Sequence, residues 1–354
     1  MKASSSQIWA GYAALATGLA LLPFLIGMTA GNSWVRILDF SLLYIMLALG
    51  LNIVVGFAGL LDLGYIAFYA VGAYLYALLA SSHFAIHLSV WIILPLGSLL
   101  ACLFGVLLGA PTLKLRGDYL AIVTLGFGEI VRLFMNNLDR PINITNGPQG
   151  IDLIDPASFM GYSLSRGFSI GSMHFGSAYA YYYLFLLAVL AVIFVCVRLE
   201  NSRIGRAWVA IREDEVAAQA MGINTRNIKL LAFAMGASFG GVAGGLFAGF
   251  QGFVSPESFT LMESVMVLCM VVLGGMGHIP GVILGAVLLT ITPELLREGI
   301  NPLQRSLFGR IVVDPENFRM VLFGLALILV MLFRPAGLWP SKRRKQELGV
   351  EPHE

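Results

Sequence analysis

The sequence predicts an all-α integral membrane protein built as a bundle of about ten membrane-spanning helices. Of its 354 residues, 58% are hydrophobic and only 12% are charged, whereas a soluble domain carries roughly 25% charged residues. The hydrophobic residues also form stretches of about 20 residues, which is the length that crosses a bilayer as a helix. With a formal net charge of only +2, this composition excludes a cytosolic enzyme, a disordered protein and a nucleic-acid binder.

The long apolar stretches define the individual spans. None of them alternates between apolar and polar residues as the strands of outer-membrane barrels do, so we expect helices. The first is interpreted as a retained anchor, because it shows no clear small-residue cleavage site, and the alternative is a signal peptide. In the last, only residues 320–333 are uncharged, so Arg319 and Arg334 have to reach toward the membrane surface. The predicted spans are residues 8–28, 39–60, 64–80, 89–110, 118–135, 177–197, 230–250, 261–277, 279–297 and 318–334.

Lysine and arginine in the loops indicate the orientation, because these residues concentrate on the cytoplasmic side of a membrane. They are frequent in residues 198–229 and in the segment after residue 334, and sparse in residues 136–176. The arginines between residues 297 and 319 are an exception, since the order of the spans places them outside. We expect residues 1–335 to form one transmembrane domain, residues 336–354 to form a tail, and both termini to lie in the cytoplasm.

The longest loop on the predicted inner side has helical character of its own. Residues 204–229 combine apolar residues such as Trp208 with a charged turn, and Gly222 is placed to end a short helix. Asn224 or Thr225 can cap the helix that follows. A short helix across this face suits the transmission of a push from a soluble partner, and an interfacial helix resting on lipid headgroups fits the residues equally well. The charged turn comprises Arg212, Glu213, Asp214 and Glu215.

Two apolar segments, residues 51–74 and 271–287, are interrupted by glycines with almost no loop between their halves. Paired, interrupted segments in the two halves of a transporter indicate an internal inverted repeat and a transport site near the membrane midplane. The alternative is that these glycines simply let helices pack closely. When the segments are aligned, Gly56 coincides with Gly274 and Gly59 with Gly277.

Ionisable residues within the spans are few. Glu129 and Arg132 are three residues apart on one helix face, and we interpret them as a structural ion pair rather than as part of a transport pathway. The other acidic residues near spans lie at predicted ends or breaks, where solvation is easy, so the sequence gives no support for a proton relay. These residues are Asp62, Asp118, Glu263 and Glu294.

The predicted external loop, residues 136–176, is rich in Asn, Gly, Pro, Asp and Ser, the residues that form turns. A loop of this length usually has a function of its own. It is either a docking surface for a soluble external partner or a passive connector.

Signatures of catalysis and of cofactor binding are missing from the sequence. It has no G-x-x-x-x-G-K-[ST] phosphate loop, and the HFAIH stretch at residues 83–87 lacks the glutamate of a zinc protease. Cys102, Cys196 and Cys269 fall inside apolar stretches, which does not indicate a disulfide framework or a metal site. We therefore expect a protein that is not an enzyme and that binds no metal or cofactor itself.

Four sequence blocks within roughly residues 40–335 carry a resemblance to a known family. They are, in order, ALGLNIVVGFAGLLDLGYIAFYAVGAY, LKLRGDYLAIVTLGFGEIVR, SRIGRAWVAIREDEVAAQAMGIN and LGGMGHIPG. With these blocks in this order, the chain resembles the LivM-type permease subunits of bacterial branched-chain amino acid ABC importers. That resemblance implies a multi-pass protein of the bacterial inner membrane that works with a LivH-type second permease. It also implies two cytoplasmic ATPase subunits, which bind ATP and Mg²⁺, and an external substrate-binding protein.

The resemblance also implies roles for particular residues. Residues 204–222 correspond to the coupling helix that docks into the ATPase, with Arg212, Glu213 and Asp214 as exposed contacts. Importers of this kind often show E-A-A followed three residues later by Gly; here Val216 takes the place of the glutamate, and Glu215 comes one position too early. The matching small residues are Ala217, Ala218 and Gly222. The residues expected to line or shape the pathway are Asn52, Gly56, Gly59, Gly274, Gly275 and Gly277.

The expected function is therefore that of a permease subunit which forms the pathway for branched-chain or related neutral amino acids. The alternative is a secondary transporter of a small zwitterionic solute driven by protons or sodium ions, which would share the interrupted helices. Such a transporter is expected to carry a carboxylate in the middle of a span.

Overall fold

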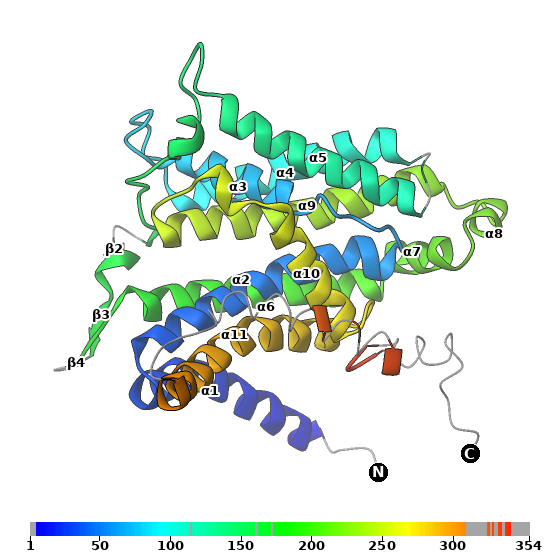
Figure 1. The fold of residues 1–354 in the computed structure, drawn as a ribbon. Helices are drawn as coiled ribbons and strands as arrows, with labels where there is room; N and C mark the ends of the chain where they lie inside the picture. Colours follow the sequence, from blue (N-terminus) through cyan, green and yellow to red (C-terminus); the bar gives the residue numbers. More distant parts are fainter. Residues whose placement is uncertain are drawn as a thin grey trace.

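The computed structural model describes residues 5–113, 115, 117–159, 162–170 and 173–308, together with 324–325, 328, 332–334 and 337–340. Most of the predicted tail and most of the last predicted span lie outside these residues. The described part is a helical bundle with two short β-hairpins (Figure 1). Its helices are α1 (Ser5–Thr29), α2 (Asn32–Asn52), α3 (Ile66–Leu79), α4 (Val90–Thr112), α5 (Asp118–Asn137), α6 (Ser177–Glu200), α7 (Arg203–Glu213), α8 (Glu215–Ala220), α9 (Thr225–Gln251), α10 (Leu261–Gly274) and α11 (Ile279–Phe308).

The first nine predicted spans all coincide with helices, namely α1 to α6 and α9 to α11. Within the described residues, six helical segments are long and apolar enough to cross a membrane, so a multi-pass helical protein is confirmed and the count of ten remains a prediction. Those six are Asn32–Phe57, Val90–Thr112, Ser177–Glu200, Thr225–Gln251, Pro256–Gly274 and Ile279–Gly299.

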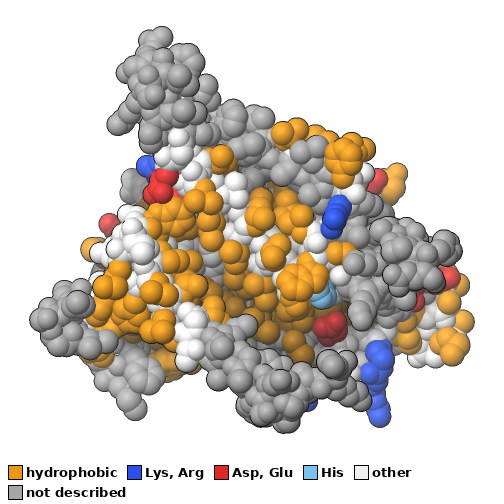
Figure 2. Space-filling view, turned by 90° about the horizontal axis from the view of Figure 1, so that it is seen from below, with side chains coloured by type: hydrophobic (Ala, Val, Ile, Leu, Met, Phe, Trp, Pro, Cys, Tyr) orange, Lys and Arg blue, Asp and Glu red, His pale blue; other side chains and the backbone are white. Residues whose placement is uncertain are grey.

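Helix α2 forms the centre of the bundle. Its most apolar window is 89% buried, compared with 33% for α4, α6 and α11, because α6, α9, α10 and α11 all pack around it. The surface of the bundle is apolar as well: Leu99 and Leu107 on α4 and Phe194 on α6 are exposed. Hydrophobic side chains cover most of the described surface on the face in Figure 2. An apolar surface around an apolar core is what a lipid environment requires.

Glycines allow α9 to pack closely against α3 and α4. A side chain at Gly72 of α3 would collide with the backbone of Gly241 on α9, and one at Gly244 would collide with the carbonyl of Tyr69. Such close approach of backbones is how small residues stabilise helix pairs in membranes. Close helix packing was the alternative that we considered for the glycines of the two interrupted segments, and Gly72, in the first segment, has this role.

The two ends of the bundle carry different structures (Figure 1). Helices α7 and α8 lie at one end, and the strands β2, β3 and β4 lie at the other. The long loop is more ordered than its composition suggested, because Ile151 pairs with Val254 through two backbone hydrogen bonds of 2.8 and 2.9 Å. Its strands are β1 (Ser158–Phe159), paired with β2 (Tyr162–Ser163), and β3 (Phe168–Ile170), paired with β4 (Met173–Phe175).

We predict that Gly244→Ala destabilises the protein by about 1–3 kcal/mol, because the new methyl group would lie 2.8 Å from the backbone nitrogen of Ala73 and overpack the contact between α9 and α3. Thermal unfolding of the purified protein in detergent measures the effect. The matched control is Gly126→Ala in α5, where the methyl group meets nothing within 4 Å. Since alanine favours helix by up to about 1 kcal/mol over glycine, the control should unfold at the same or a higher temperature. Equal melting of the two variants would contradict the prediction.

Candidate functional site

The first interrupted segment contains a real break in the helix. Helix α2 ends at Asn52 and continues as a π-helical turn, Ile53–Phe57, before the chain runs without helix to Tyr65. Gly59, in this stretch, has a φ of +71°, a conformation that favours glycine. Single π-helical turns inside membrane helices often mark functional sites.

The second interrupted segment also contains a break between two helices. Helix α10 ends at Gly274 and α11 begins at Ile279, and the glycines between them have φ values of +119° at Gly275 and +77° at Gly277. Any side chain at Gly274 would collide with the carbonyl of Gly281, so only glycine allows this turn. The glycines of both breaks therefore serve backbone conformation and close backbone contact.

The two breaks meet, although more than 200 residues separate them in the sequence. The Asn52 side chain is 1% exposed, and its Oδ1 accepts a 2.8 Å hydrogen bond from the backbone nitrogen of Gly277. A Cβ atom at Gly56 would lie 2.6 Å from that same nitrogen. Gly56 thus lies in direct backbone contact with Gly277.

Arg212 of α7 joins the two breaks. Its Nη1 donates a 2.7 Å hydrogen bond to the carbonyl of Gly56, its aliphatic stem packs against Gly59, and its guanidinium lies beside Gly277. Arg212 is half-buried against the breaks rather than exposed as expected, and its contact with an ATPase remains a prediction. We call this set of five residues the break junction: Asn52, Gly56, Gly59, Arg212 and Gly277.

The segment 204–222 folds as two helices rather than one. Asp214 separates them and caps α8, accepting hydrogen bonds of 2.8 and 3.0 Å from the backbone nitrogens of Val216 and Ala217. Glu213, Asp214 and Ala217 are exposed, whereas Ala218 is buried. Gly222, with a φ of +84°, ends α8 as expected, and the Asn224 side chain caps α9.

The corner formed by α7, α8 and α9 is held together from inside. Trp208 is fully buried and donates a 2.7 Å hydrogen bond to the carbonyl of Ile228. Lys229, also buried, forms an ion pair of 2.5 Å with Glu215. Because Trp208 and Ile211 are buried in protein, α7 does not have the free apolar face of a helix that rests on lipid.

The break junction lies at the end of the bundle rather than at its middle. The 21 residues of α2 extend about 31 Å at 1.5 Å per residue, which is close to the thickness of a bilayer core. Asn52 is therefore a full span away from Asn32, at the end where α7 lies. Helices α2 and α10 both run toward this end, so these two segments do not support an inverted relation, and the inverted repeat remains a prediction.

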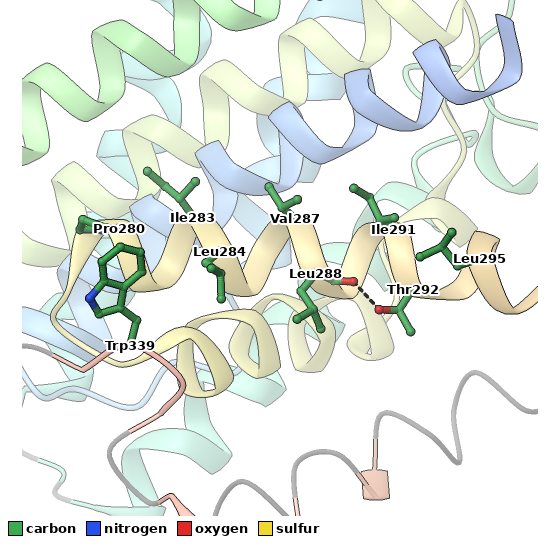
Figure 3. A pocket seen from close by; sticks show the side chains of 9 residues that line it. All are labelled: Pro280, Ile283, Leu284, Val287, Leu288, Ile291, Thr292, Leu295 and Trp339. Atoms are coloured by element: carbon green, nitrogen blue, oxygen red, sulfur yellow. Dashed lines mark hydrogen bonds between the residues drawn. The ribbon is translucent and has the colours of Figure 1, made fainter. Parts of the chain in front are cut away.

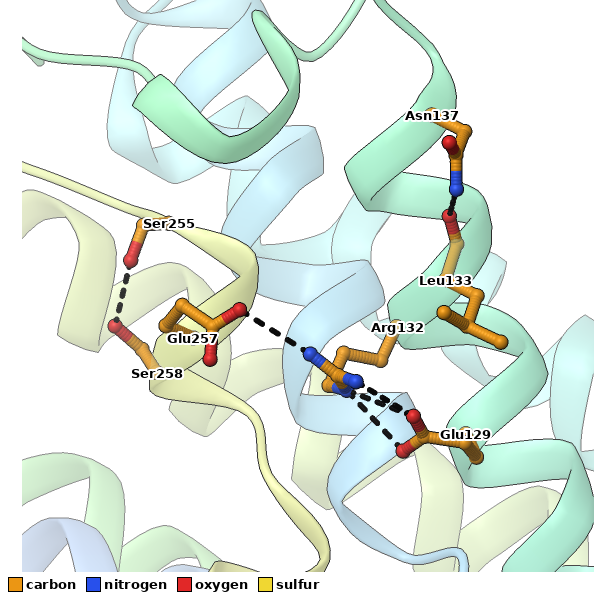
Figure 4. A network of polar contacts seen from close by, with 7 residues as sticks. All are labelled: Glu129, Arg132, Leu133, Asn137, Ser255, Glu257 and Ser258. Carbon is orange, nitrogen blue, oxygen red and sulfur yellow. Dashed lines mark hydrogen bonds and ion pairs between the residues drawn. The ribbon is translucent and has the colours of Figure 1, made fainter.

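The carboxylate of Glu129 and the guanidinium of Arg132 lie together on α5, with Oε1 and Nη2 2.6 Å apart (Figure 4). The same guanidinium contacts Glu257 at 3.2 Å, in the turn before α10. Arg132 thus connects α5 to the start of α10, a link that sequence reasoning missed because the partner is 125 residues away.

Two acidic side chains lie deeper than the sequence indicated. Helix α2 begins at Asn32, seven residues before the predicted span, so Asp39 lies two turns inside it; this residue is fully buried and accepts no hydrogen bond from the described residues. Glu263 accepts a 2.9 Å hydrogen bond from the hydroxyl of Tyr44. The sequence did contain a sign that Asp39 lies within the helix. Apolar residues flank it on both sides, including Leu38, which precedes the predicted start of the span.

A groove of about 540 Å³ runs along α11 (Figure 3). Its lining is apolar except for Thr292, whose hydroxyl donates to the carbonyl of Leu288 in the same helix. The groove therefore offers no charged group to orient a zwitterion. Among the described residues, no group of three His, Cys, Asp or Glu side chains is placed to hold a metal ion.

Comparisons with known proteins agree with this architecture. A family model described as the permease component of the branched-chain amino acid transport system matches residues 33–331. The chain is 46% identical over 327 residues to the high-affinity branched-chain amino acid transport system permease protein LivM of Escherichia coli K12, covering 89% of this chain and 72% of that protein. It is 25% identical over 305 residues to LivH, another permease protein of that system in the same organism, covering 83% and 90%.

A probable LivM permease protein of Methanocaldococcus jannaschii is 29% identical over 255 residues, covering 71% of this chain and 69% of that protein. No solved structure matches the chain. Both the extent of the family match and the identity to a LivM protein establish the assignment, and the chain belongs to the family of branched-chain amino acid transport system permeases.

Proposed function

We propose that this chain is the LivM-type permease subunit of an ABC importer that carries branched-chain or related neutral amino acids across the bacterial inner membrane. Its family membership and its 46% identity to a LivM protein support the substrate class. The break junction supports the mechanism, because it connects α7, at one end of the bundle, to both interrupted helices.

The proposed importer contains partners at both ends of the bundle. A second, LivH-type permease completes the pathway, as suggested by the similarity of this chain to both LivM and LivH. Two ATPase subunits, which bind ATP and Mg²⁺, dock on the exposed residues of α7 and α8, Glu213, Asp214 and Ala217. An external binding protein docks on residues 136–176 at the opposite end. Both termini of the chain lie in the cytoplasm.

The proposed mechanism is alternating access. ATP binding closes the ATPase dimer and displaces α7 and α8, and Arg212 transmits this movement to the carbonyl of Gly56. The glycines at both breaks allow the backbone to change direction there at little steric cost. ATP hydrolysis then resets the permease. The chain itself positions and moves the pathway helices and performs no catalysis.

One observation bears on the alternative of a secondary transporter. Glu263 is a half-buried carboxylate bonded to Tyr44 of α2, and a carboxylate within a span is the feature that such a transporter needs. The two functions differ in their energy source, so uptake of radiolabelled leucine in cells separates them. We expect uptake to stop when ATP is depleted and to persist with a protonophore while ATP is maintained. The opposite pattern would overturn the importer.

We predict that Glu213→Arg combined with Asp214→Asn prevents copurification of the ATPase subunits but not of the second permease. The first substitution reverses an exposed charge, and the second keeps the cap of α8, since asparagine caps a helix as well as aspartate does. Mass spectrometry of the tagged chain, gently solubilised from native membranes, measures this. The control is Asp152→Asn, an exposed acid at the other end. Retention of the ATPases by the double variant would disprove the docking surface.

We predict that Arg212→Met lowers uptake by roughly tenfold or more, since a hydrogen bond from a charged donor to a buried acceptor contributes about 1.5–3 kcal/mol. Methionine keeps the packing of the stem on Gly59, so the ATPases should still copurify and still hydrolyse ATP. The control is Arg226→Met, which removes an exposed cation near the same end. If uptake and ATP hydrolysis fell together in R212M, Arg212 would be needed for docking and not for transmission.

A further inference from the structure

A small cavity of about 220 Å³ lies where α2, α10 and α11 meet. One part of its wall is apolar and comes from all three helices, with Phe40, Met266 and Leu289. The polar part includes Tyr44 and Glu263. Its volume lies below the roughly 300–1,000 Å³ of drug-sized pockets, so it suits a small solute and not a cofactor.

Glu263 lies near the middle of the bundle. It precedes the end of α10 at Gly274 by 11 residues, or about 17 Å along the helix. Tyr44, its hydrogen-bond partner, precedes Asn52 by eight residues, or about 12 Å. In a bilayer core of about 30 Å, these lengths place the carboxylate close to the midplane. Although Glu263 is at the start of α10, that start lies about halfway along the bundle and not at its end, and Leu261 and Met262 there are exposed.

The charge of Glu263 has no counterion in the described part of the chain. Its Oε2 accepts the hydrogen bond from Tyr44, and no basic side chain of the described residues lies within ion-pair distance. The second acid of the cavity, Glu294, differs in this respect, since Arg297 lies 3.6 Å from it. A carboxylate at this depth faces protein or a water-filled space and marks a solute pathway. A transiently bound cation would neutralise the Glu263 carboxylate and complete the site.

We propose that this cavity binds a branched-chain amino acid in transit, with its α-ammonium group on the Glu263 carboxylate and its aliphatic side chain against Phe40, Met266 and Leu289. This inference rests on the proposed function and adds a substrate site to it. Tyr44 holds the carboxylate in place. Because the charged contact engages the ammonium end alone, binding is weak enough for the solute to leave.

The test measures occupancy directly, on the full chain together with its copurifying subunits in vesicles. Thr290→Cys places a small thiol on the cavity wall, in a background where Cys102, Cys196 and Cys269 are replaced by alanine. At a leucine concentration of about ten times its Kd, labelling of the thiol by N-ethylmaleimide should slow about tenfold. The analogue 4-methylpentanoate, which has the carbon skeleton of leucine without the ammonium group, should not slow it.

Substitutions at Glu263 identify the group responsible. Glu263→Gln should abolish the protection of the thiol by leucine. Glu263→Asp keeps the charge and should retain part of this protection, so it tests the proposal even if the Gln variant does not assemble. The control Glu257→Gln makes the same chemical change six residues earlier, at an exposed position, and should keep full protection. Equal protection by leucine and by 4-methylpentanoate, or full protection in E263Q, would overturn the proposal.

Two further outcomes are distinguishable. Slow labelling without leucine in phosphatidylethanolamine vesicles, but not in phosphatidylglycerol vesicles, would assign the site to a lipid amine and overturn the assignment to an amino acid. ATP-dependent leucine uptake by the Thr290→Cys protein without any protection would disprove this site and leave the importer function standing. Absence of ATP-dependent uptake in the unsubstituted protein would instead disprove the importer function.

Discussion

Backbone groups that are buried at a helix break need hydrogen-bond partners from the protein, because water does not reach them. Side chains from several helices meet this requirement here. Asn52 accepts from the nitrogen of Gly277, and Arg212 donates to the carbonyl of Gly56. Thr124 of α5 accepts from the nitrogen of Leu63, and Ser264 of α10 accepts from that of Ile66, each at 3.0 Å. The breaks therefore fix how α2, α5, α7 and α10 are arranged.

Because the first break is hydrogen-bonded to Arg212 of α7, the corner of α7, α8 and α9 is part of the membrane domain. Trp208 attaches α7 to α9 through the carbonyl of Ile228, and the buried pair of Lys229 and Glu215 attaches α8 to the same helix. A displacement of α7 thus moves the start of α9 with it. Since α9 packs closely against α3 and α4 at glycine positions, such a displacement is passed into the centre of the bundle.

Much of the fold could be predicted because lipid constrains composition and length. Apolar stretches identified the first nine spans, and glycines identified both breaks, since positive φ at Gly59, Gly275 and Gly277 favours that residue. The predicted span begins seven residues after the start of α2, because the charged Arg36 and Asp39 limit the apolar stretch from which the span was defined. In the structure Arg36 stays in the helix by packing over the rings of Phe40 and Phe250 and by bonding to Gln251. The site was less predictable, because the partner of Arg212 is 156 residues away.

The depth of the acidic residues could not be obtained from sequence for a related reason: position within a helix does not give position within a bundle. Glu263 is the third residue of α10, yet Tyr44 reaches it from the interior of α2. The proposed amino acid site and the break junction then lie on the same two helices, about 12–17 Å apart. Because helices transmit displacement along their axes, a change at the junction would alter the cavity, and by linkage an occupied cavity would bias the junction by an equal free energy. In the proposed importer, substrate and ATPase would thereby act on one element.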